Sequence, residues 1–131
     1  METVPGLLWR GSNFTLVQTT GKAPGTVIYR FAGPFTARDM HSALSPVDLR
    51  NLFEPPAQVQ SALYIFDLTE VPYIDSAGLG MLVSQFTRCQ GRGVRLVLAG
   101  VNPRVLQLLR LTRLDSLLPM AATVEEAEAR G

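Results

Sequence analysis

An aspartate followed directly by a serine is the pair of side chains in this chain that is best placed to do chemistry. Asp75 and Ser76 come after an apolar run, residues 62–68, which predicts a buried strand. The residues that follow predict a helix, because large apolar side chains recur at helical spacing at Leu79, Leu82, Val83 and Phe86. A strand-to-helix junction offers free backbone N–H groups and the positive end of a helix dipole. A hydroxyl at this place is therefore well positioned to carry a phosphate.

Capping is the alternative role for the same pair. Both aspartate and serine are favoured at helix N-caps, and on spacing alone a cap is the more frequent finding. Two glycines, Gly78 and Gly80, fall in the first turns of the predicted helix, where each costs about 1 kcal/mol relative to alanine. With the large apolar residues facing inward, the opposite side carries small, uncharged side chains up to Arg88. This side predicts a docking surface beside Ser76, formed by Ala77, Gly80, Met81 and Ser84.

Composition limits the classes of function that remain. The chain has 131 residues, 47% hydrophobic and 18% charged, which predicts one domain with a real core. A net charge of +1 gives no overall attraction to nucleic acid or anionic membranes, and Arg104, Arg110 and Arg113 form the only basic cluster. A single cysteine, Cys89, excludes an intramolecular disulfide and a cysteine-based zinc site, and we expect no cofactor. Because no membrane span or signal peptide is recognisable, we expect a cytoplasmic protein.

The remaining pattern predicts strands that alternate with helices. Residues 1–12 are expected to form a loose arm and residues 13–131 one domain. Strands are predicted at residues 14–19, 26–31, 63–68 and 94–99, with an uncertain strand or loop at 115–120. Helices are predicted at residues 46–53, 75–89 and 103–111, and after a capping Thr123. We therefore expect an α/β fold with four to five strands in a mixed sheet, in which the first two strands form a hairpin and the rest are mostly parallel.

This order of elements, together with several short motifs, resembles the STAS family. STAS domains occur in anti-sigma-factor antagonists and in the tails of sulfate transporters. The resemblance covers about residues 14–129, and its matching stretches are residues 66–69, 71–80, 93–96, 102–109, 112–114 and 125–127. The Asp-Ser-Ala-Gly-Leu-Gly sequence at residues 75–80 is the most specific of these. In family antagonists the residue after the aspartate accepts the phosphate, which implies that Ser76 is the phosphoacceptor and that the helices pack mainly on one face of the sheet.

The resemblance implies a non-enzymatic partner switch in bacterial transcription. The unphosphorylated protein would bind an anti-sigma factor that is also a serine kinase and so release a sigma factor. Phosphorylation would end that binding, and a phosphatase would restore it, without direct nucleic-acid binding or membrane insertion. The partner-binding residues would surround the phosphoacceptor, at Asp75, Ala77, Gly78, Gly80, Met81 and Ser84.

The chain departs from the family pattern at residues 33–36. Many antagonists carry an acidic Gly-Glu-x-Asp there, whereas this chain has Gly-Pro-Phe-Thr. A second hypothesis is therefore a STAS accessory subunit of a lipid transport complex or of another signalling assembly. A third is an enzyme with Ser76 or Asp75 as nucleophile. That hypothesis has little support, because His41 is the only histidine and lies in an unrelated segment.

Overall fold

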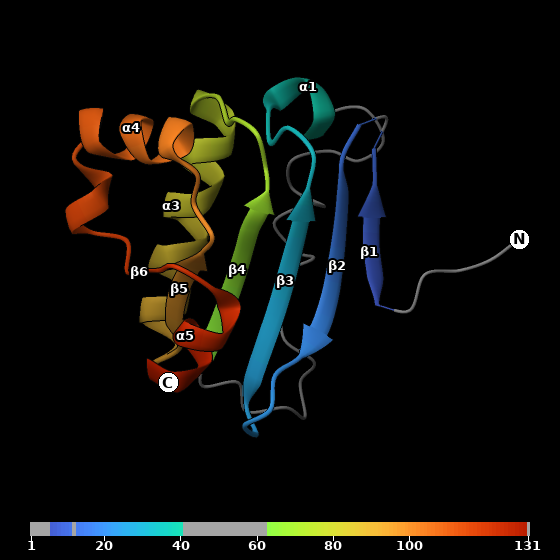
Figure 1. Ribbon diagram of the computed structural model, residues 1–131, viewed down its shortest axis with the longest axis vertical. Helices are drawn as coiled ribbons and strands as arrows, with labels where there is room; N and C mark the ends of the chain where they lie inside the picture. Colours follow the sequence, from blue (N-terminus) through green and yellow to red (C-terminus); the bar gives the residue numbers. More distant parts are fainter. Residues whose placement is uncertain (1–5, 12, 41–62, 131) are drawn as a thin grey trace, which may run out of the picture.

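A computed structural model describes residues 6–11, 13–40 and 63–130 of the chain (Figure 1). The helix predicted at residues 46–53 and the only histidine, His41, lie outside the described residues. The described residues form an α/β structure, as the alternation of strand and helix patterns predicted.

A six-stranded mixed sheet is the centre of the fold, with the strands in sequence order from one edge to the other. The first three strands are antiparallel, and the remaining neighbours are parallel. The predicted hairpin and the mostly parallel remainder are thus confirmed. The strands are β1 (Leu7–Arg10), β2 (Thr15–Thr20), β3 (Thr26–Ala32), β4 (Leu63–Glu70), β5 (Arg95–Ala99) and β6 (Met120–Ala121).

The two edge strands explain why the sheet has six strands and not four to five. Part of the expected arm forms β1, because Trp9 is buried against Phe14, with 5.2 Å between the ring centroids. At the other edge, β6 has only two residues, too few to give a strand pattern in the sequence. Between the edges, residues 63–68 of β4 are all buried, which confirms the prediction of a central strand.

Helices cover both faces of the sheet, with most of the helical residues on one face. α3 (Ser76–Gly91) and α4 (Pro103–Leu111) lie over the larger core, and α5 (Val124–Arg130) lies over a smaller cluster on the opposite face (Figure 1). A short α1 (Ala37–Met40) follows β3, and a 3₁₀ helix, η1 (Leu114–Ser116), follows α4. The smaller cluster consists of Ile28, Leu63, Ile65, Val97, Ala99, Ala121 and Ala127.

Side-chain caps begin three of the helices where the sequence predicted them. Asp75 caps α3, and Asn102 caps α4 by accepting a hydrogen bond from the Val105 N–H at 2.8 Å. Thr123 accepts a hydrogen bond from the Glu126 N–H at 3.1 Å at the start of α5. Local capping chemistry therefore determines where the chain changes from strand or loop to helix.

The orientation of α3 differs from the prediction on one side. Leu79, Leu82 and Phe86 are buried as predicted, but Met81 is only 7% exposed, whereas it was expected to face outward. Val83, expected to face inward, is half-buried. The physical reason is that the buried part of the helix surface is wider than predicted. It includes the side of Gly78, which packs against the chain before α1 instead of facing solvent.

Candidate functional site

The Asp75 carboxylate joins the first turns of two helices. Its Oδ1 accepts a hydrogen bond from the Gly78 N–H at 3.0 Å, and its Oδ2 accepts one from the Ala37 N–H at 3.0 Å, at the start of α1. Capping is therefore the role that the structure confirms for Asp75. Each oxygen is thus held by a backbone donor at the start of a different helix.

The segments that leave β3 and β4 run side by side, and this brings the two helix starts together. The Gly33 N–H donates to the Glu70 carbonyl oxygen at 2.9 Å, and the Phe35 N–H donates to the Tyr73 carbonyl oxygen at 3.1 Å. A Cβ on Gly78 would collide with the carbonyl oxygen of Phe35. Gly78 is thus required by this close approach of two backbones.

Residues 33–36, where the family's acidic motif is missing, form part of the core. Phe35 has no exposed surface, and its ring contacts Phe14 at 5.4 Å and Phe31 at 5.0 Å between centroids. Thr36 is buried as well. In place of carboxylates on the rim, this chain has an aromatic side chain that holds the start of α1 against α3.

Ser76 lies exposed at the first position of α3, at the strand-to-helix junction where the sequence placed it. The described residues include no hydrogen-bond partner for its hydroxyl. The N–H groups of Ser76 and Ala77 belong to the first turn of α3, in which backbone donors have no acceptor within the helix. A group attached to the hydroxyl would therefore meet solvent, free donors and the positive end of a helix of 16 residues.

The exposed side of α3 continues from Ser76 as a surface of small or uncharged side chains. We call it the α3 outer face, and it consists of Ser76, Gly80, Val83, Ser84 and Thr87. A Cβ on Gly80 would meet no atom within 4 Å, so no contact within the described structure requires a glycine there. Of the residues predicted for a docking surface, Gly80 is exposed and Ala77 and Ser84 are half-buried, whereas Met81 is buried.

A tyrosine and an arginine from different segments meet beside this surface. The Arg104 guanidinium lies 4.9 Å from the centroid of the Tyr73 ring. The Asn102 side-chain amide places the start of α4 here, since it donates to the carbonyl oxygens of Val71 at 2.9 Å and Pro72 at 3.2 Å. No local pattern predicts this pair, because it depends on how α4 is placed against the loop that follows β4.

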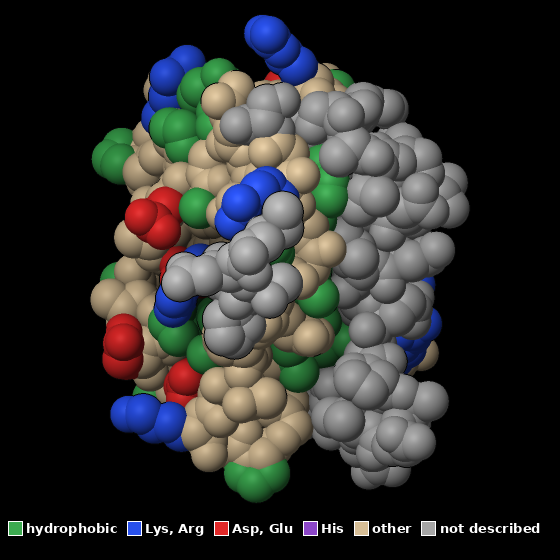
Figure 2. All heavy atoms as spheres, turned by 90° about the vertical axis from the view of Figure 1, so that its right-hand side faces the viewer, with side chains coloured by type: hydrophobic (Ala, Val, Ile, Leu, Met, Phe, Trp, Pro, Cys, Tyr) green, Lys and Arg blue, Asp and Glu red, His purple; other side chains and the backbone are tan. Residues whose placement is uncertain are grey.

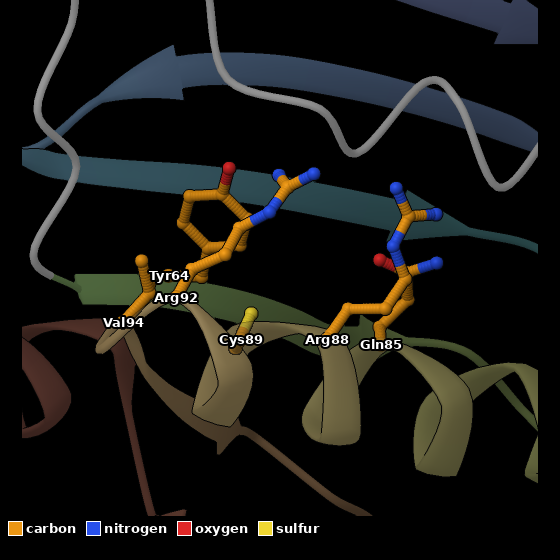
Figure 3. A pocket seen from close by; sticks show the side chains of 6 residues that line it. All are labelled: Tyr64, Gln85, Arg88, Cys89, Arg92 and Val94. Atoms are coloured by element: carbon orange, nitrogen blue, oxygen red, sulfur yellow. The ribbon is translucent and has the colours of Figure 1, made fainter.

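A small cavity lies near the other end of α3. Its volume is about 10 Å³, room for about one water molecule, and it is lined by Tyr64, Gln85, Arg88, Cys89, Arg92 and Val94 (Figure 3). Burial raises the pKa of the Cys89 thiol to about 11, although Arg92 and Arg88 act in the opposite direction. Burial also raises the pKa of the Tyr64 hydroxyl. Cys89 is thus a buried, protonated thiol, as its helix position predicted.

A wider cleft lies on the α5 side of the sheet, at the ends of β3 and β4. Its volume is about 650 Å³, and Arg30, Asp67, Thr69 and Glu125 are among its lining residues. Asp67 is buried and paired with Arg30, with 3.1 Å between Nε and Oδ2, and it also accepts from the Thr69 hydroxyl at 2.6 Å. These groups stabilise one another, and none of them belongs to the surface around Ser76.

Comparison with known proteins identifies the family. The family model described as "STAS domain" matches residues 18–127 of this chain. The chain belongs to the STAS domain family. The capped α3 with its exposed Ser76 is therefore the α3 of a STAS domain.

Relatives and solved structures agree with this assignment. The anti-sigma-B factor antagonist of Listeria monocytogenes is 39% identical over 62 residues, which are 47% of this chain and 54% of that protein. The chain thus spans about half the length of the Listeria relatives that it matches. The anti-sigma factor antagonist SpoIIAA in its unphosphorylated form is 18% identical, with a TM-score of 0.66 over 88% of this chain and 94% of that one. A sulfate transporter family protein of Wolinella succinogenes is 23% identical, with a TM-score of 0.69 over 86% of this chain and 87% of that one.

The described helices and the face seen from the β1 side bear on contact with membranes. No helix among the described residues is long and apolar enough to cross a membrane. From the β1 side, basic and acidic side chains are interspersed with apolar ones over the described surface (Figure 2).

Proposed function

We propose that this STAS domain is an anti-sigma-factor antagonist that works by phosphorylation-controlled partner switching. Its partner is an anti-sigma factor that is also a serine kinase, which would place the exchange in the cytoplasm. The single observation that carries the proposal is the exposed Ser76 hydroxyl, without a hydrogen-bond partner among the described residues, at the head of the uncharged α3 outer face. The name of the Listeria relative supports the class of partner.

The proposed modification converts a neutral docking surface into a charged one. The Ser76 oxygen attacks the γ-phosphorus of ATP, ADP leaves, and the hydroxyl proton is taken up by the kinase. The phosphoserine adds about −1.5 to −2 charges. In the free domain this charge is tolerated, because it stays in solvent at the positive end of α3. The modification therefore changes binding while it leaves the fold intact.

A bound partner would remove that solvent. Burying a phosphate without a matching cation costs several kcal/mol, enough to abolish an ordinary interface. The α3 outer face has no charged member, and the one basic side chain of α3, Arg88, lies in its last turn and lines the small cavity. Arg104 lies nearby but is placed over the Tyr73 ring. In the proposal, the unphosphorylated domain binds and the phosphorylated domain does not.

The structure divides the proposed binding residues into two groups. The exposed Gly80 and the half-buried Ser84 and Ala77 are accessible on or beside the α3 outer face and would contact the partner directly. Gly78 and Met81 are buried, and Asp75 caps two helices. These three residues would contribute by holding the first turns of α3 in place.

Phosphorylation with the cognate kinase tests the proposed site. The kinase is the anti-sigma factor recovered with the unphosphorylated chain in a pull-down, and the variants are Ser76→Ala and Ser84→Ala. Peptide mass spectrometry after incubation with ATP should place the phosphate on Ser76 in the wild type and in Ser84→Ala, and should find none in Ser76→Ala. Phosphate on Ser84 or Thr69 would overturn the assignment.

A further inference from the structure

Exposed leucines mark a second surface at the junction of α4 and η1. Among the described residues, the large apolar side chains that are exposed are Tyr73, Leu111 and Leu117. Leu111 ends α4 and is 75% exposed, and Leu117 follows η1 and is 45% exposed. Because η1 packs against α4, these two leucines lie at the same corner of the molecule. A single exposed leucine needs no explanation, and here two exposed leucines belong to one packed α4–η1 unit.

Two arginines flank these leucines and outnumber the one carboxylate at the corner, the exposed Asp115 of η1. Arg110 and Arg113 are exposed, and the described residues include no ion-pair partner for either guanidinium. Arg110 has one structural role, since a cation in the last turn of a helix interacts favourably with the dipole. No such role accounts for the guanidinium of Arg113, which lies beyond the end of α4. We call Arg110, Leu111, Arg113 and Leu117 the leucine–arginine corner.

The backbone of Arg113 is the third observation. Its φ of 64° lies in the left-handed region, and among the described residues no other non-glycine has a positive φ. The residue follows the C-cap of a helix, where glycine is usual because it adopts this conformation without steric conflict. The conformation is held by local bonds, as the Arg113 carbonyl oxygen accepts from the Ser116 hydroxyl at 3.0 Å. The chain thus keeps an arginine where glycine would be easier, and such local strain is a recognised mark of a functional position.

We propose that the leucine–arginine corner binds an acidic amphipathic segment of a partner protein. The two guanidiniums would pair with carboxylates, which they can bind in a bidentate way, and the leucines would contact apolar side chains of the same segment. The corner is small and combines charge with apolar surface, so it fits a short peptide segment better than a lipid surface. The surface excludes Ser76 and goes beyond the proposed switch, so binding here is independent of the phosphorylation state.

A synthetic peptide provides the probe. It is a short fluorescein-labelled helix former with leucines at helical spacing and glutamates elsewhere, and its matched control has lysine in place of each glutamate. Fluorescence anisotropy is measured with the full chain and with Arg113→Gly and Leu111→Ser. Arg10→Gln, at the exposed end of β1 at one edge of the sheet, is the matched charge control.

The expected result separates binding from stability. The glutamate peptide binds the wild type and Arg10→Gln equally, and binds Arg113→Gly and Leu111→Ser about tenfold more weakly. The melting temperature of Arg113→Gly is unchanged or higher, because glycine relieves the left-handed backbone. Ser76→Glu binds the peptide like the wild type, so failure of the phosphorylation switch would leave this result standing.

Several outcomes would overturn the proposal. Equal peptide affinity in the wild type and both corner variants would exclude the corner as the binding surface. Equal binding of the lysine peptide would show that charge does not select the partner. A lower melting temperature for Arg113→Gly would assign Arg113 a structural role. Binding to phosphatidylserine vesicles that is lost in the corner variants, without peptide binding, would assign the corner to membranes.

Discussion

Asp75 shows how one side chain positions the candidate site. Its two oxygens accept from Gly78 and Ala37, and these donors belong to helices that follow different strands. The carboxylate therefore sets the position at which α3 begins, directly before Ser76. It also holds the start of α1 against the first turn of α3. The sequence could identify the cap, since the pattern is local, but it could not identify the Ala37 partner, which is 38 residues away.

Variants of Asp75 should separate the two bonds. Asp75→Asn retains one oxygen and can accept only one of the two backbone donors, whereas Asp75→Ala accepts neither. Loss of a cap costs about 0.5–2 kcal/mol, and an unsatisfied half-buried N–H adds about 1–3 kcal/mol. Urea denaturation should give the order wild type, Asp75→Asn, Asp75→Ala in decreasing stability. Equal stability of the wild type and Asp75→Ala would show that neither bond matters.

The buried thiol of Cys89 makes the free energy of unfolding depend on pH in the alkaline range. Burial raises the pKa of its thiol from an ordinary value of 9.0 to about 11, so the folded form holds this proton more tightly than the unfolded form. The contribution of the buried, neutral thiol to the free energy of unfolding is fully present below the pKa that the thiol has in the unfolded chain. It is lost as the pH rises through about 11. Burial acts in the same direction on the pKa of Tyr29 and of Tyr64.

The urea midpoint should therefore fall as pH is raised from about 8 towards about 11, the raised pKa of the Cys89 thiol. In Cys89→Ala the fall should be smaller, because one of the three titrating groups is absent. Iodoacetamide at pH about 8 should label the folded wild type slowly and the urea-unfolded chain rapidly. An identical pH dependence in both proteins, or rapid labelling of the folded form, would contradict the buried position of Cys89.

At the scale of the element, α3 combines a regular spacing of large apolar side chains with two glycines in unlike surroundings. The spacing of Leu79, Leu82 and Phe86 was enough to predict the helix and most of its buried face. It did not predict that Met81 is buried, because the segment carrying Phe35 covers the neighbouring side at Gly78 and no local pattern shows that contact. Helix periodicity identifies a buried direction, while the width of the buried arc depends on tertiary neighbours.

The two glycines of α3 should respond oppositely to alanine. Gly78→Ala places a Cβ against the Phe35 carbonyl oxygen and should destabilise the fold, whereas Gly80→Ala meets open space and should stabilise it by up to about 1 kcal/mol. Thermal unfolding of the two variants provides the measurement, and each glycine is the control for the other. If Gly80→Ala also weakens partner binding, the bare backbone serves docking. Equal destabilisation in both variants would contradict the exposed position of Gly80.

At the scale of the whole molecule, the sequence predicted the order of elements better than their number. The central strand, the hairpin and the capped helices follow from patterns within single segments, and these were confirmed. The edge strand β1 was missed because Trp9 is buried through long-range contact with Phe14, while its own segment is too short for a clear alternation. The Tyr73–Arg104 contact was missed for the same reason, since it joins the loop after β4 to the start of α4.

Trp9 tests whether β1 is part of the core. Its ring is 4% exposed, and its Nε1 is buried without a hydrogen-bond partner in the described structure. Trp9→Ala should cost about 3–5 kcal/mol, the usual range for loss of a large buried side chain. Trp9→Phe should cost much less, because it keeps an aromatic ring and removes an unsatisfied donor. Urea denaturation that finds Trp9→Ala as stable as the wild type would place β1 outside the core.

The central claim concerns charge at Ser76, and partner affinity measures it most directly. The measurement is a calorimetric titration of the anti-sigma factor recovered in the pull-down with the wild type, Ser76→Gln and Ser76→Glu. Glutamine and glutamate have nearly the same shape, so their difference isolates the charge. The account predicts near wild-type affinity for Ser76→Gln and a loss of at least about tenfold for Ser76→Glu, with similar melting temperatures because α3 tolerates an anion at its first turn. Equal affinity of the two variants would contradict the account, even if Ser76 proved to be phosphorylated.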